Sequence, residues 1–426
     1  MHIQKSVSAR GVISIVDQMV VSGTNFLSIV AVGRTSGLDS LALYSLGFSV
    51  LVLVATSVRS LVVTPYMVLA KQRELPQQQA MRCCVLIAWG VCAMISIIAA
   101  LAWILVAPVQ SNATNPPGSF VLLVILAIPC WLLREIARQI CMSDLRFVTA
   151  LVLDVITSAT QLAAIAYCYF QSNAVSESMA MGVVLATSLG AGLVWLLSTG
   201  QSFPRRSAVL SQVMGELWKF GRWGAVSQAS HVAQGYAVHW ILLLTSGLQA
   251  AGVYAAAASI VQLANPIING AGNALIPLFS ARRGEHGPES LRRAVTKISP
   301  IALVAGVAFV GMTLALGVQI AMMVYGDRFA ISRQLIVSLS VVVAINAIVL
   351  PATKVISVLE FPQVNCALNL GTFALTAVLG TLGSMVSGLE GAAIGLLCAA
   401  GVGGCAKWIA YRRIIHNSMS SEHQQP

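Results

Sequence analysis

The chain has few charged side chains for its length. Only 9% of its 426 residues are Asp, Glu, Lys or Arg, whereas a soluble domain carries roughly 25%. Apolar residues make up 57%, and the mean hydropathy is +0.84. These values exclude an ordinary soluble domain. They predict an all-α integral membrane protein, because a helix that crosses a hydrocarbon core about 30 Å thick needs roughly 20 apolar residues.

Signatures of catalysis, metal binding and nucleic-acid binding are lacking as well. The sequence contains no P-loop, no H-E-x-x-H and no G-x-S-x-G motif. None of the nine cysteines forms a C-x-x-C pair, and we interpret them as small core residues rather than metal ligands or disulfides. The net charge of +11 comes from cations at helix ends and in short loops, which does not indicate nucleic acid. We therefore expect a protein that is not an enzyme and that uses no cofactor and no metal.

What the sequence does contain is a series of twelve long apolar segments. A Pro-, Arg- and Ser-containing stretch near the middle, residues 201–216, predicts a cytoplasmic linker between an N-terminal six-helix bundle (1–200) and a C-terminal six-helix bundle (217–426). The expected spans are residues 10–33, 39–69, 83–107, 119–141, 147–170, 178–199, 218–244, 249–279, 296–324, 331–358, 363–386 and 390–411.

Lysines and arginines are distributed unevenly between the two sides of these spans. If the N-terminus is cytoplasmic, the inner loops and helix ends hold most of them, Lys407 included, and the outer loops hold only Arg34, Arg328 and Arg333. This asymmetry predicts a multi-pass protein of the cell inner (plasma) membrane with both termini in the cytoplasm.

Two stretches about 210 residues apart repeat each other. The first begins Thr35-Ser36-Gly37-Leu38 and reaches Tyr44, and the second begins Thr245-Ser246-Gly247-Leu248 and reaches Tyr254 at the same spacing. With six spans in each half, the two halves point the same way, so the repeat is parallel. A duplicated membrane unit is typical of secondary transporters, which move one half against the other around a central site.

Polar side chains form a stripe on the first span and another on the seventh. Their spacings of mostly three and four residues place them on one helical face. We interpret the stripes as two walls of a water-filled cavity; the alternative is hydrogen bonding between helices in a dry bundle. The stripes consist of Ser14, Gln18, Ser22, Asn25 and Ser28, and of Ser227, Gln228, His231, Gln234 and His239.

Several ionisable side chains lie inside the expected spans, where an uncompensated charge costs several kcal/mol, and seven of them are candidate site residues. Glu135 is three residues before Arg138 and can pair with it. Arg134 and Asp154 lie at similar depth and could also pair. The candidate substrate-binding cations are Arg59, Arg134, Arg138 and Lys354. The candidate ion-coupling acids are Asp17, Glu135 and Asp154.

Three of the four cations also have a structural alternative. Arg59 could form an ion pair with an unidentified acid, and Arg138 and Lys354 could reach the membrane surface by snorkelling. Because the cations equal or outnumber the acids, the sequence favours a positive cavity and an anionic substrate such as a phosphate or pyrophosphate. An exporter of cationic drugs would favour an acidic, aromatic-lined site.

One pair of sequence runs resembles a known family. Residues 252–257 read Gly-Val-Tyr-Ala-Ala-Ala, and residues 275–280 read Leu-Ile-Pro-Leu-Phe-Ser. They are similar to the eighth helix of bacterial polysaccharide flippases, within the multidrug/oligosaccharidyl-lipid/polysaccharide (MOP) exporter superfamily. The resemblance implies a V-shaped arrangement of two bundles, like that of multidrug and toxic compound extrusion (MATE) transporters. It also implies an undecaprenyl-pyrophosphate-linked oligosaccharide turned from the inner to the outer leaflet, and a cavity lined by cations, a role that Arg59, Arg134 and Arg138 would fill.

The expected partners are therefore the lipid-linked glycan, membrane lipids and other polysaccharide-assembly proteins. A proton or sodium gradient could drive the return step through Asp17, Glu135 or Asp154. Two alternatives stay open. One is a MATE-type antiporter of cationic drugs. The other is a membrane-embedded glycan transferase or polymerase, which would need a catalytic residue in a large outer loop; the longest outer loop, about Pro108 to Gly118, has no acid or base.

Overall fold

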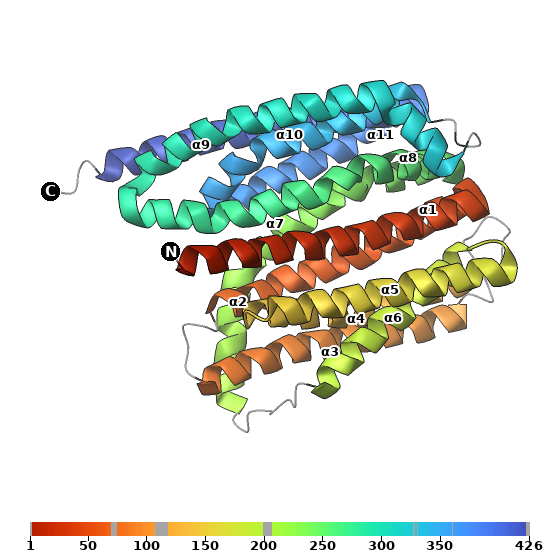
Figure 1. The fold of residues 1–426 in the computed structure, drawn as a ribbon, viewed down its shortest axis with the longest axis horizontal. Helices are drawn as coiled ribbons and strands as arrows, with labels where there is room; N and C mark the ends of the chain where they lie inside the picture. Colours follow the sequence, from red (N-terminus) through yellow and green to blue (C-terminus); the bar gives the residue numbers. More distant parts are fainter. Residues whose placement is uncertain are drawn as a thin grey trace. The chain divides into compact units, whose positions relative to one another are not determined.

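The protein is built from helices throughout the part of the chain that the structure describes. This computed structural model describes residues 2–69, 75–106, 118–198, 207–326, 329, 331–359 and 361–422. The elements are α1 (His2–Val58), η1 (Arg59–Val63), α2 (Thr64–Leu69), α3 (Leu75–Val106), α4 (Gly118–Ser143), α5 (Phe147–Ser172), α6 (Glu177–Ser198), α7 (Ser207–Thr245), α8 (Leu248–Val261), η4 (Gln262–Ala264), α9 (Asn265–Tyr325), α10 (Arg333–Val358) and α11 (Pro362–Glu422) (Figure 1).

The helices agree with the expected membrane spans. Nine described helical segments are long and apolar enough to cross a membrane. Two of these contain a break, at Gly37 in α1 and at Ser387 and Gly388 in α11, and so supply two expected spans each. The polar helix α7, 39 residues long, completes the series of twelve. The predicted all-α membrane fold is confirmed, whereas the orientation of the termini stays a prediction. The expected outer loop lies outside the described residues, apart from Gly118 at the start of α4.

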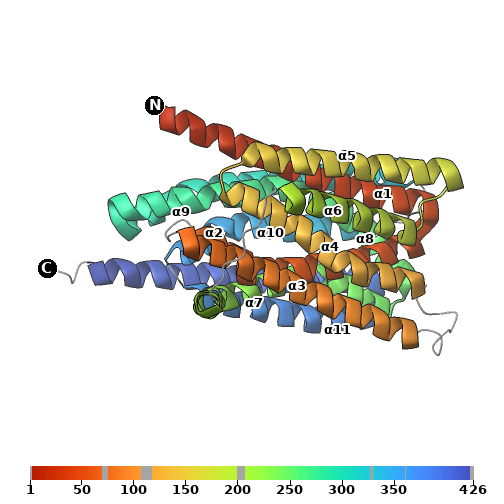
Figure 2. The same ribbon diagram turned by 90° about the horizontal axis from the view of Figure 1, so that it is seen from below.

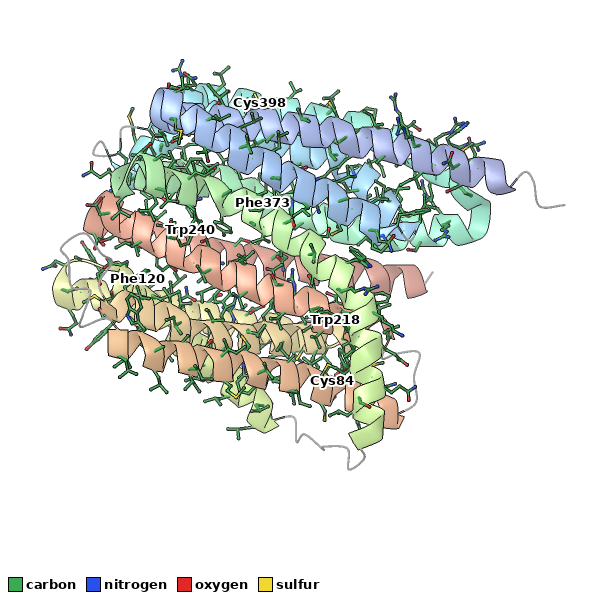
Figure 3. All side chains as sticks on the ribbon, turned by 180° about the vertical axis from the view of Figure 1, so that it is seen from behind. Cys84, Phe120, Trp218, Trp240, Phe373 and Cys398 are labelled. Carbon is green, nitrogen blue, oxygen red and sulfur yellow. The ribbon has the colours of Figure 1, made fainter. Side chains whose placement is uncertain are left out.

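The chain divides into two compact units, Met1–Val232 (unit 1) and Ala233–Pro426 (unit 2). The boundary falls inside α7, which is helical from Ser207 onward, so the last ten residues of the expected linker 201–216 are helix rather than loop. The first part of α7 belongs to unit 1 because Val213 and Leu217 are buried in its core. The side chain of Trp218, one residue further on, lies at the surface (Figure 3). The division into two six-helix bundles remains a prediction.

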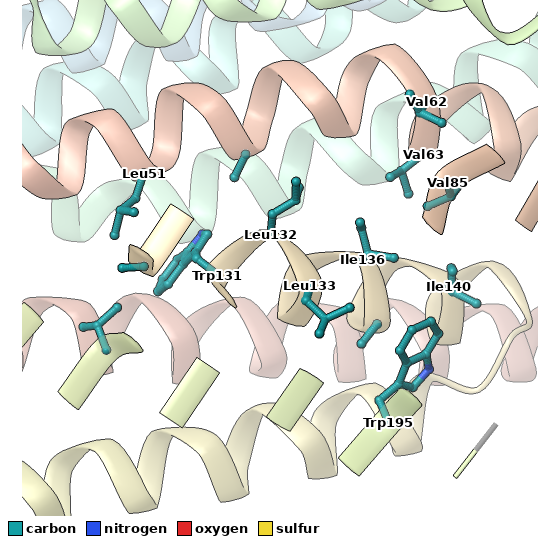
Figure 4. Close-up of a cluster of buried hydrophobic side chains, with 14 of the residues drawn as sticks. Leu51, Val62, Val63, Val85, Trp131, Leu132, Leu133, Ile136, Ile140 and Trp195 are labelled. Carbon is teal, nitrogen blue, oxygen red and sulfur yellow. The ribbon is translucent and has the colours of Figure 1, made fainter. Parts of the chain in front are cut away.

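Helix α4 lies at the centre of unit 1. Its side chains Leu132, Leu133 and Ile136 are fully buried, and side chains from α1, η1, α3 and α6 surround them (Figure 4). Glycines let the neighbouring helices approach closely. A Cβ atom on Gly192 of α6 would lie 2.7 Å from Leu133 Cγ, and one on Gly47 of α1 would lie 2.8 Å from Phe120 Cζ.

Unit 2 has its own core, built from α9, α10 and α11. Leu275, Phe279, Ala352, Val355 and Tyr411 are buried together in it. The two arms of α11, before and after Gly388, pack so closely that a Cβ atom on either Gly391 or Gly395 would clash with the backbone of the other arm.

The sequence repeat is also a structural repeat at two helix corners. Gly37 and Gly247 both adopt positive φ values, 89° and 85°, with ψ near 180°, a conformation that favours glycine. The threonine two residues before each glycine forms a hydrogen bond at another helix corner of the same unit. This corner lies between α5 and α6 in unit 1 and near the break of α11 in unit 2. Val175 N–H donates to Thr35 Oγ1 at 2.8 Å, and the hydroxyls of Thr245 and Ser384 lie 2.6 Å apart.

A single π-helical turn, η1, interrupts the second span just before Pro65. Proline lacks the N–H that continues an α-helix, and the wider turn accommodates it, with Thr64 N–H bonded to Arg59 O. Gly221 of α7 packs directly on this turn, where a Cβ atom would clash with the Leu61 carbonyl. The π turn sets the position of Arg59, its first residue.

Candidate functional site

Six charged side chains from four elements meet inside unit 1. Helix α4 contributes three of them within five residues, and α1, α5 and η1 contribute one each. In both ribbon views α1 and α5 run side by side (Figures 1 and 2). The six residues, called the charge network below, are Asp17, Arg59, Arg134, Glu135, Arg138 and Asp154.

Arg138 lies at the centre of the charge network and contacts three acids. Its Nη1 lies 3.0 Å from Asp17 Oδ2 and its Nη2 lies 3.0 Å from Glu135 Oε1. Its Nε is 3.7 Å from Asp154 Oδ2. The Arg138 side chain is only 8% exposed, which excludes snorkelling to the membrane surface as its role. One guanidinium therefore joins α1, α4 and α5.

Arg134 and Asp154 form the most deeply buried ion pair. Arg134 Nη2 lies 2.8 Å from Asp154 Oδ1, with the two side chains 7% and 0% exposed. The guanidinium also lies over the ring of Trp131, 5.4 Å from its centroid. The pairing predicted from residue depth is thus confirmed, as is that of Glu135 with Arg138.

Arg59 marks the more accessible edge of the charge network. Its Nη1 lies 3.1 Å from Glu135 Oε1, and the two side chains are 30% and 18% exposed. Gln139 Nε2 donates to the same carboxylate oxygen at 3.0 Å. The acid partner that the sequence left unidentified is therefore Glu135.

Because they are paired with acids, the arginines of the charge network do not provide the positive charge that the sequence analysis expected in a cavity. Three arginines face three carboxylates, so the charge network is neutral when all six are ionised. Buried charges are tolerated in hydrocarbon when they are paired in this way. Arg134 and Arg138 hold acids in place and do not form an open cationic surface.

Helix α5 carries a buried polar stripe that sequence reasoning missed. Asp154, Thr157, Ser158 and Gln161 lie on one face and are at most 6% exposed. Gln161 Nε2 donates to Ser28 Oγ of α1 at 3.0 Å. The spacings of three and four residues were visible in the sequence, but Asp154 alone was singled out as ionisable.

Four buried oxygen atoms around this stripe have no hydrogen-bond partner among the described residues: Asp17 Oδ1, Asp154 Oδ2, Ser158 Oγ and Gln161 Oε1. Buried polar groups are normally satisfied by protein, water or an ion. Two of the four belong to carboxylates that share Arg138. The seam between α1 and α5 therefore has the oxygen atoms to accept a proton or a cation.

The polar stripe predicted on the first span is divided between two faces. Ser28, together with Asp17 and Thr24, is buried inside unit 1, whereas Gln18, Ser22 and Asn25 are half-buried on the next face. On α7, Gln228 is half-buried, His231 is exposed and Gln234 and His239 are buried. The side chain of Ser14 lies outside the described part. The predicted water-filled cavity stays a prediction.

Comparison of the structure with known proteins shows its fold. The sequence matches no protein-family model and no curated protein. In contrast, a multidrug resistance MATE family transporter of the MOP superfamily in an inward-facing conformation is similar with a TM-score of 0.74 and 15% identity, over 96% of this chain and 99% of that one. The chain has the fold of a MATE transporter.

Two further structures show the range of proteins with the MATE fold. An outward-facing MATE family transporter matches with a TM-score of 0.64 and 16% identity, over 96% of both chains. A MOP superfamily transporter from Pyrococcus furiosus Vc1 (DSM3638), described as having a binding pocket of reverse polarity that suggests a different function, matches with a TM-score of 0.68 and 15% identity, over 96% of this chain and 95% of that one.

The MATE fold of this chain does not need a buried charge network in both copies of its repeat. In the second copy Ser227 stands at the position of Asp17, and the described part of unit 2 has no buried acid. Yet unit 2 has a closely packed core and the same helix corner. A feature that one copy of a duplicated fold lacks is not required for folding, so the charge network is the best candidate for a functional site.

Lys354 is the one predicted cation outside the charge network. It lies on α10 beside Gly272 of α9 and is half-buried. Among the described residues it makes no ion pair and no hydrogen bond. No described acid therefore neutralises the Lys354 ammonium, whereas acids neutralise the guanidinium groups of Arg134 and Arg138.

Proposed function

We propose that the protein is an ion-coupled secondary transporter that turns an anionic, undecaprenyl-pyrophosphate-linked oligosaccharide from the inner to the outer leaflet by alternating access. The observation that carries the proposal is the charge network: buried carboxylates with unsatisfied oxygens, present in one copy of the repeat and absent from the described part of the other. The MATE fold supports it, because similar proteins have been solved facing inward and facing outward.

Coupling in this proposal works through the two carboxylates that share Arg138. With both ionised, Arg138 joins α1 and α5 to α4 through Asp17 and Asp154. A proton added to Asp17 removes the negative charge that holds Nη1, and the link between α1 and α4 weakens. A sodium ion at Asp17 Oδ1 and Asp154 Oδ2 would draw the two acids together instead. Either ion changes the forces between helices of unit 1, as gating requires.

The anionic substrate follows from the charges that stay uncompensated. The three arginines of the charge network are neutralised, but Lys354 has no acid partner among the described residues. A half-buried ammonium without a counter-charge attracts an anion, and a pyrophosphate offers several oxygen acceptors. In this assignment Lys354 binds substrate, Arg59 lies at the edge of the charge network, and Arg134 and Arg138 position the coupling acids.

A second candidate is an antiporter of cationic drugs. It is favoured by the neutrality of the charge network, which removes most of the positive charge that argued against it, and by similarity to transporters described as multidrug resistance proteins. No described residue favours the third alternative, a membrane-embedded transferase or polymerase.

Complementation separates these functions. In cells that lack the gene, the polysaccharide reading predicts that undecaprenyl-linked intermediates accumulate on the inner leaflet and that the wild-type protein relieves this. Lys354→Met at equal membrane abundance should fail to restore surface polysaccharide. Lys297→Met should succeed, because Lys297 is exposed on α9. Normal polysaccharide together with new sensitivity to cationic dyes would overturn the flippase and support the antiporter.

The coupling site has a separate test. Asp17→Asn and Asp154→Asn should each abolish the dependence of transport on a proton or sodium gradient, whereas Asp39→Asn, at an exposed position, should leave it intact. Gradient dependence that survives both buried substitutions would remove the charge network from the coupling mechanism, whichever substrate is carried.

A further inference from the structure

The first part of α7, residues 207–223, belongs to unit 1 and is called the α7 arm below. The start of α7 runs across the direction of α3 and α4, whereas α3, α4 and α5 run along one another (Figures 1 and 2). Helices α3, α4 and α5 are long and apolar enough to cross a membrane. A helix that runs across them lies along the plane of the membrane and does not pass through it.

One face of the α7 arm is fixed to unit 1. Val213 and Leu217 are buried in the core of the unit. Gly221 packs against the backbone of η1, where an added Cβ atom would clash with the Leu61 carbonyl. These buried positions recur every four residues, so they share one helical face. The opposite face of the arm is left outside the core.

The α7 arm lies at the level where the spans of unit 1 end. Cys84 Sγ of α3 donates to Leu210 O of the arm at 3.8 Å. Two residues before Cys84, Arg82 forms an ion pair with Asp144 in the corner between α4 and α5. The distribution of cations in the sequence predicts that this corner faces the cytoplasm. The arm is therefore at the height of the phospholipid headgroups of the inner leaflet.

The outward face of the α7 arm combines two cations with two tryptophans. Lys219 and Arg222 are exposed, and the side chains of Trp218 and Trp223 are 56% and 36% exposed (Figure 3). With 3.6 residues per turn, the two cations lie opposite the buried face, with one tryptophan on either side of them. The Arg222 guanidinium lies 5.5 Å from the centroid of the Trp223 ring. Among the described residues neither cation forms an ion pair.

This combination of side chains fits an anionic lipid surface. Tryptophan gathers at the boundary between hydrocarbon and water, and lysine and arginine are attracted by the negative charge of the inner leaflet. A face turned toward lipid tails would not carry two cations without acids. An acidic protein in the cytoplasm would meet a surface beyond the headgroups, whereas the α7 arm packs against α3 and η1 within the ends of the spans.

We propose that the outward face of the α7 arm binds anionic phospholipids of the inner leaflet. Lys219 and Arg222 contact the lipid phosphates, and the indole rings of Trp218 and Trp223 lie among the headgroups. Both cations can donate charge-assisted hydrogen bonds to phosphate oxygens. The surface is separate from the charge network and from Lys354, so the proposal does not depend on which substrate the protein carries.

Hydrogen–deuterium exchange of the full-length protein in nanodiscs tests this surface locally. Amide exchange in residues 207–223 is compared between discs of phosphatidylcholine and discs that contain phosphatidylglycerol. In the wild-type protein, phosphatidylglycerol should slow exchange of the arm by roughly fivefold to twentyfold, because each cation at an anionic surface contributes about fivefold to binding. The double variant Lys219→Gln/Arg222→Gln should lose this protection. The control Arg412→Gln/Arg413→Gln, which removes two exposed cations of α11, should keep it.

Three outcomes would overturn the proposal. Equal exchange of the wild-type arm in both kinds of disc would mean that the arm does not recognise anionic headgroups. Full protection in Lys219→Gln/Arg222→Gln would mean that these cations do not bind lipid. Equal loss of protection in both double variants would indicate attraction by net charge alone. All four substituted side chains are exposed, so both variants should melt with the wild-type protein, which excludes misfolding as the cause of lost protection.

Discussion

At the scale of single residues, burial decides what a charge can do. Arg138 and Arg82 both contact carboxylates at hydrogen-bonding distance, but their surroundings differ. The Arg138 and Asp17 side chains are 8% and 1% exposed, whereas those of Arg82 and Asp144 are 33% and 32% exposed. Water can replace the partner of an exposed charge and cannot do so for a buried one.

Substitution of these two arginines should therefore have unequal effects. Arg138→Met leaves Asp17 without a cationic partner, although Glu135 keeps Arg59 and Asp154 keeps Arg134. It should destabilise the protein by about 3–5 kcal/mol, the cost typical of breaking a buried ion pair. Arg82→Met removes a half-exposed ion pair, worth about 0–1 kcal/mol, together with its hydrogen bond to Tyr66. Thermal melting of both variants in the same detergent measures the difference. Equal shifts would show that the charge network is solvated.

At the scale of helices, glycine decides how closely elements approach. The second arm of α11 carries Gly395 against the backbone of Leu379, while Gly401, six residues later in the same arm, has no atom within 4 Å of an added Cβ. Both positions are helical, so alanine improves intrinsic helix propensity equally at each.

The matched pair Gly395→Ala and Gly401→Ala isolates the effect of packing. Gly401→Ala should stabilise by about 0.5–1 kcal/mol through helix propensity alone. Gly395→Ala should destabilise by about 1–3 kcal/mol, because the two arms must separate to accept the methyl group. Melting temperatures that move in opposite directions would confirm the close approach. A rise in both variants would contradict it.

At the scale of the whole molecule, the orientation of the chain in the membrane is the main prediction that the structure leaves to experiment. Twelve spans place both termini on one side, and the excess of lysine and arginine in the loops of that side predicts that it is the cytoplasm.

Reporter fusions test this orientation. A fluorescent protein that folds only in the cytoplasm should be active when fused after Pro426, and alkaline phosphatase, active only outside, should be inactive there. Phosphatase inserted between α5 and α6, near Asn173, should be active, since that corner is predicted to face outward. The reverse pattern would invert the topology, and the two inserts serve as controls for each other.

Much of the charge network could be predicted from the sequence, and the part that could not has a physical reason. Depth along a helix follows from counting residues at about 1.5 Å each, so the pairing of Arg134 with Asp154 was accessible. Arg59 and Glu135 are 76 residues apart in the chain, and Asp17 and Arg138 are 121 residues apart. Residue counting does not show that the helices carrying them lie side by side. The net charge of the spans was counted correctly, but whether it forms a positive surface depends on those contacts.

The sequence by itself determined the all-helical membrane class, the breaks between spans and the duplicated corners at Gly37 and Gly247. Those features follow from apolar segment length and from backbone conformations that favour glycine, both of which are local properties. Only the tertiary structure decided which charges neutralise each other, and that Lys354 has no ion pair among the described residues. The energy of a charge in a membrane depends on its neighbours in space, and these come from distant parts of the chain.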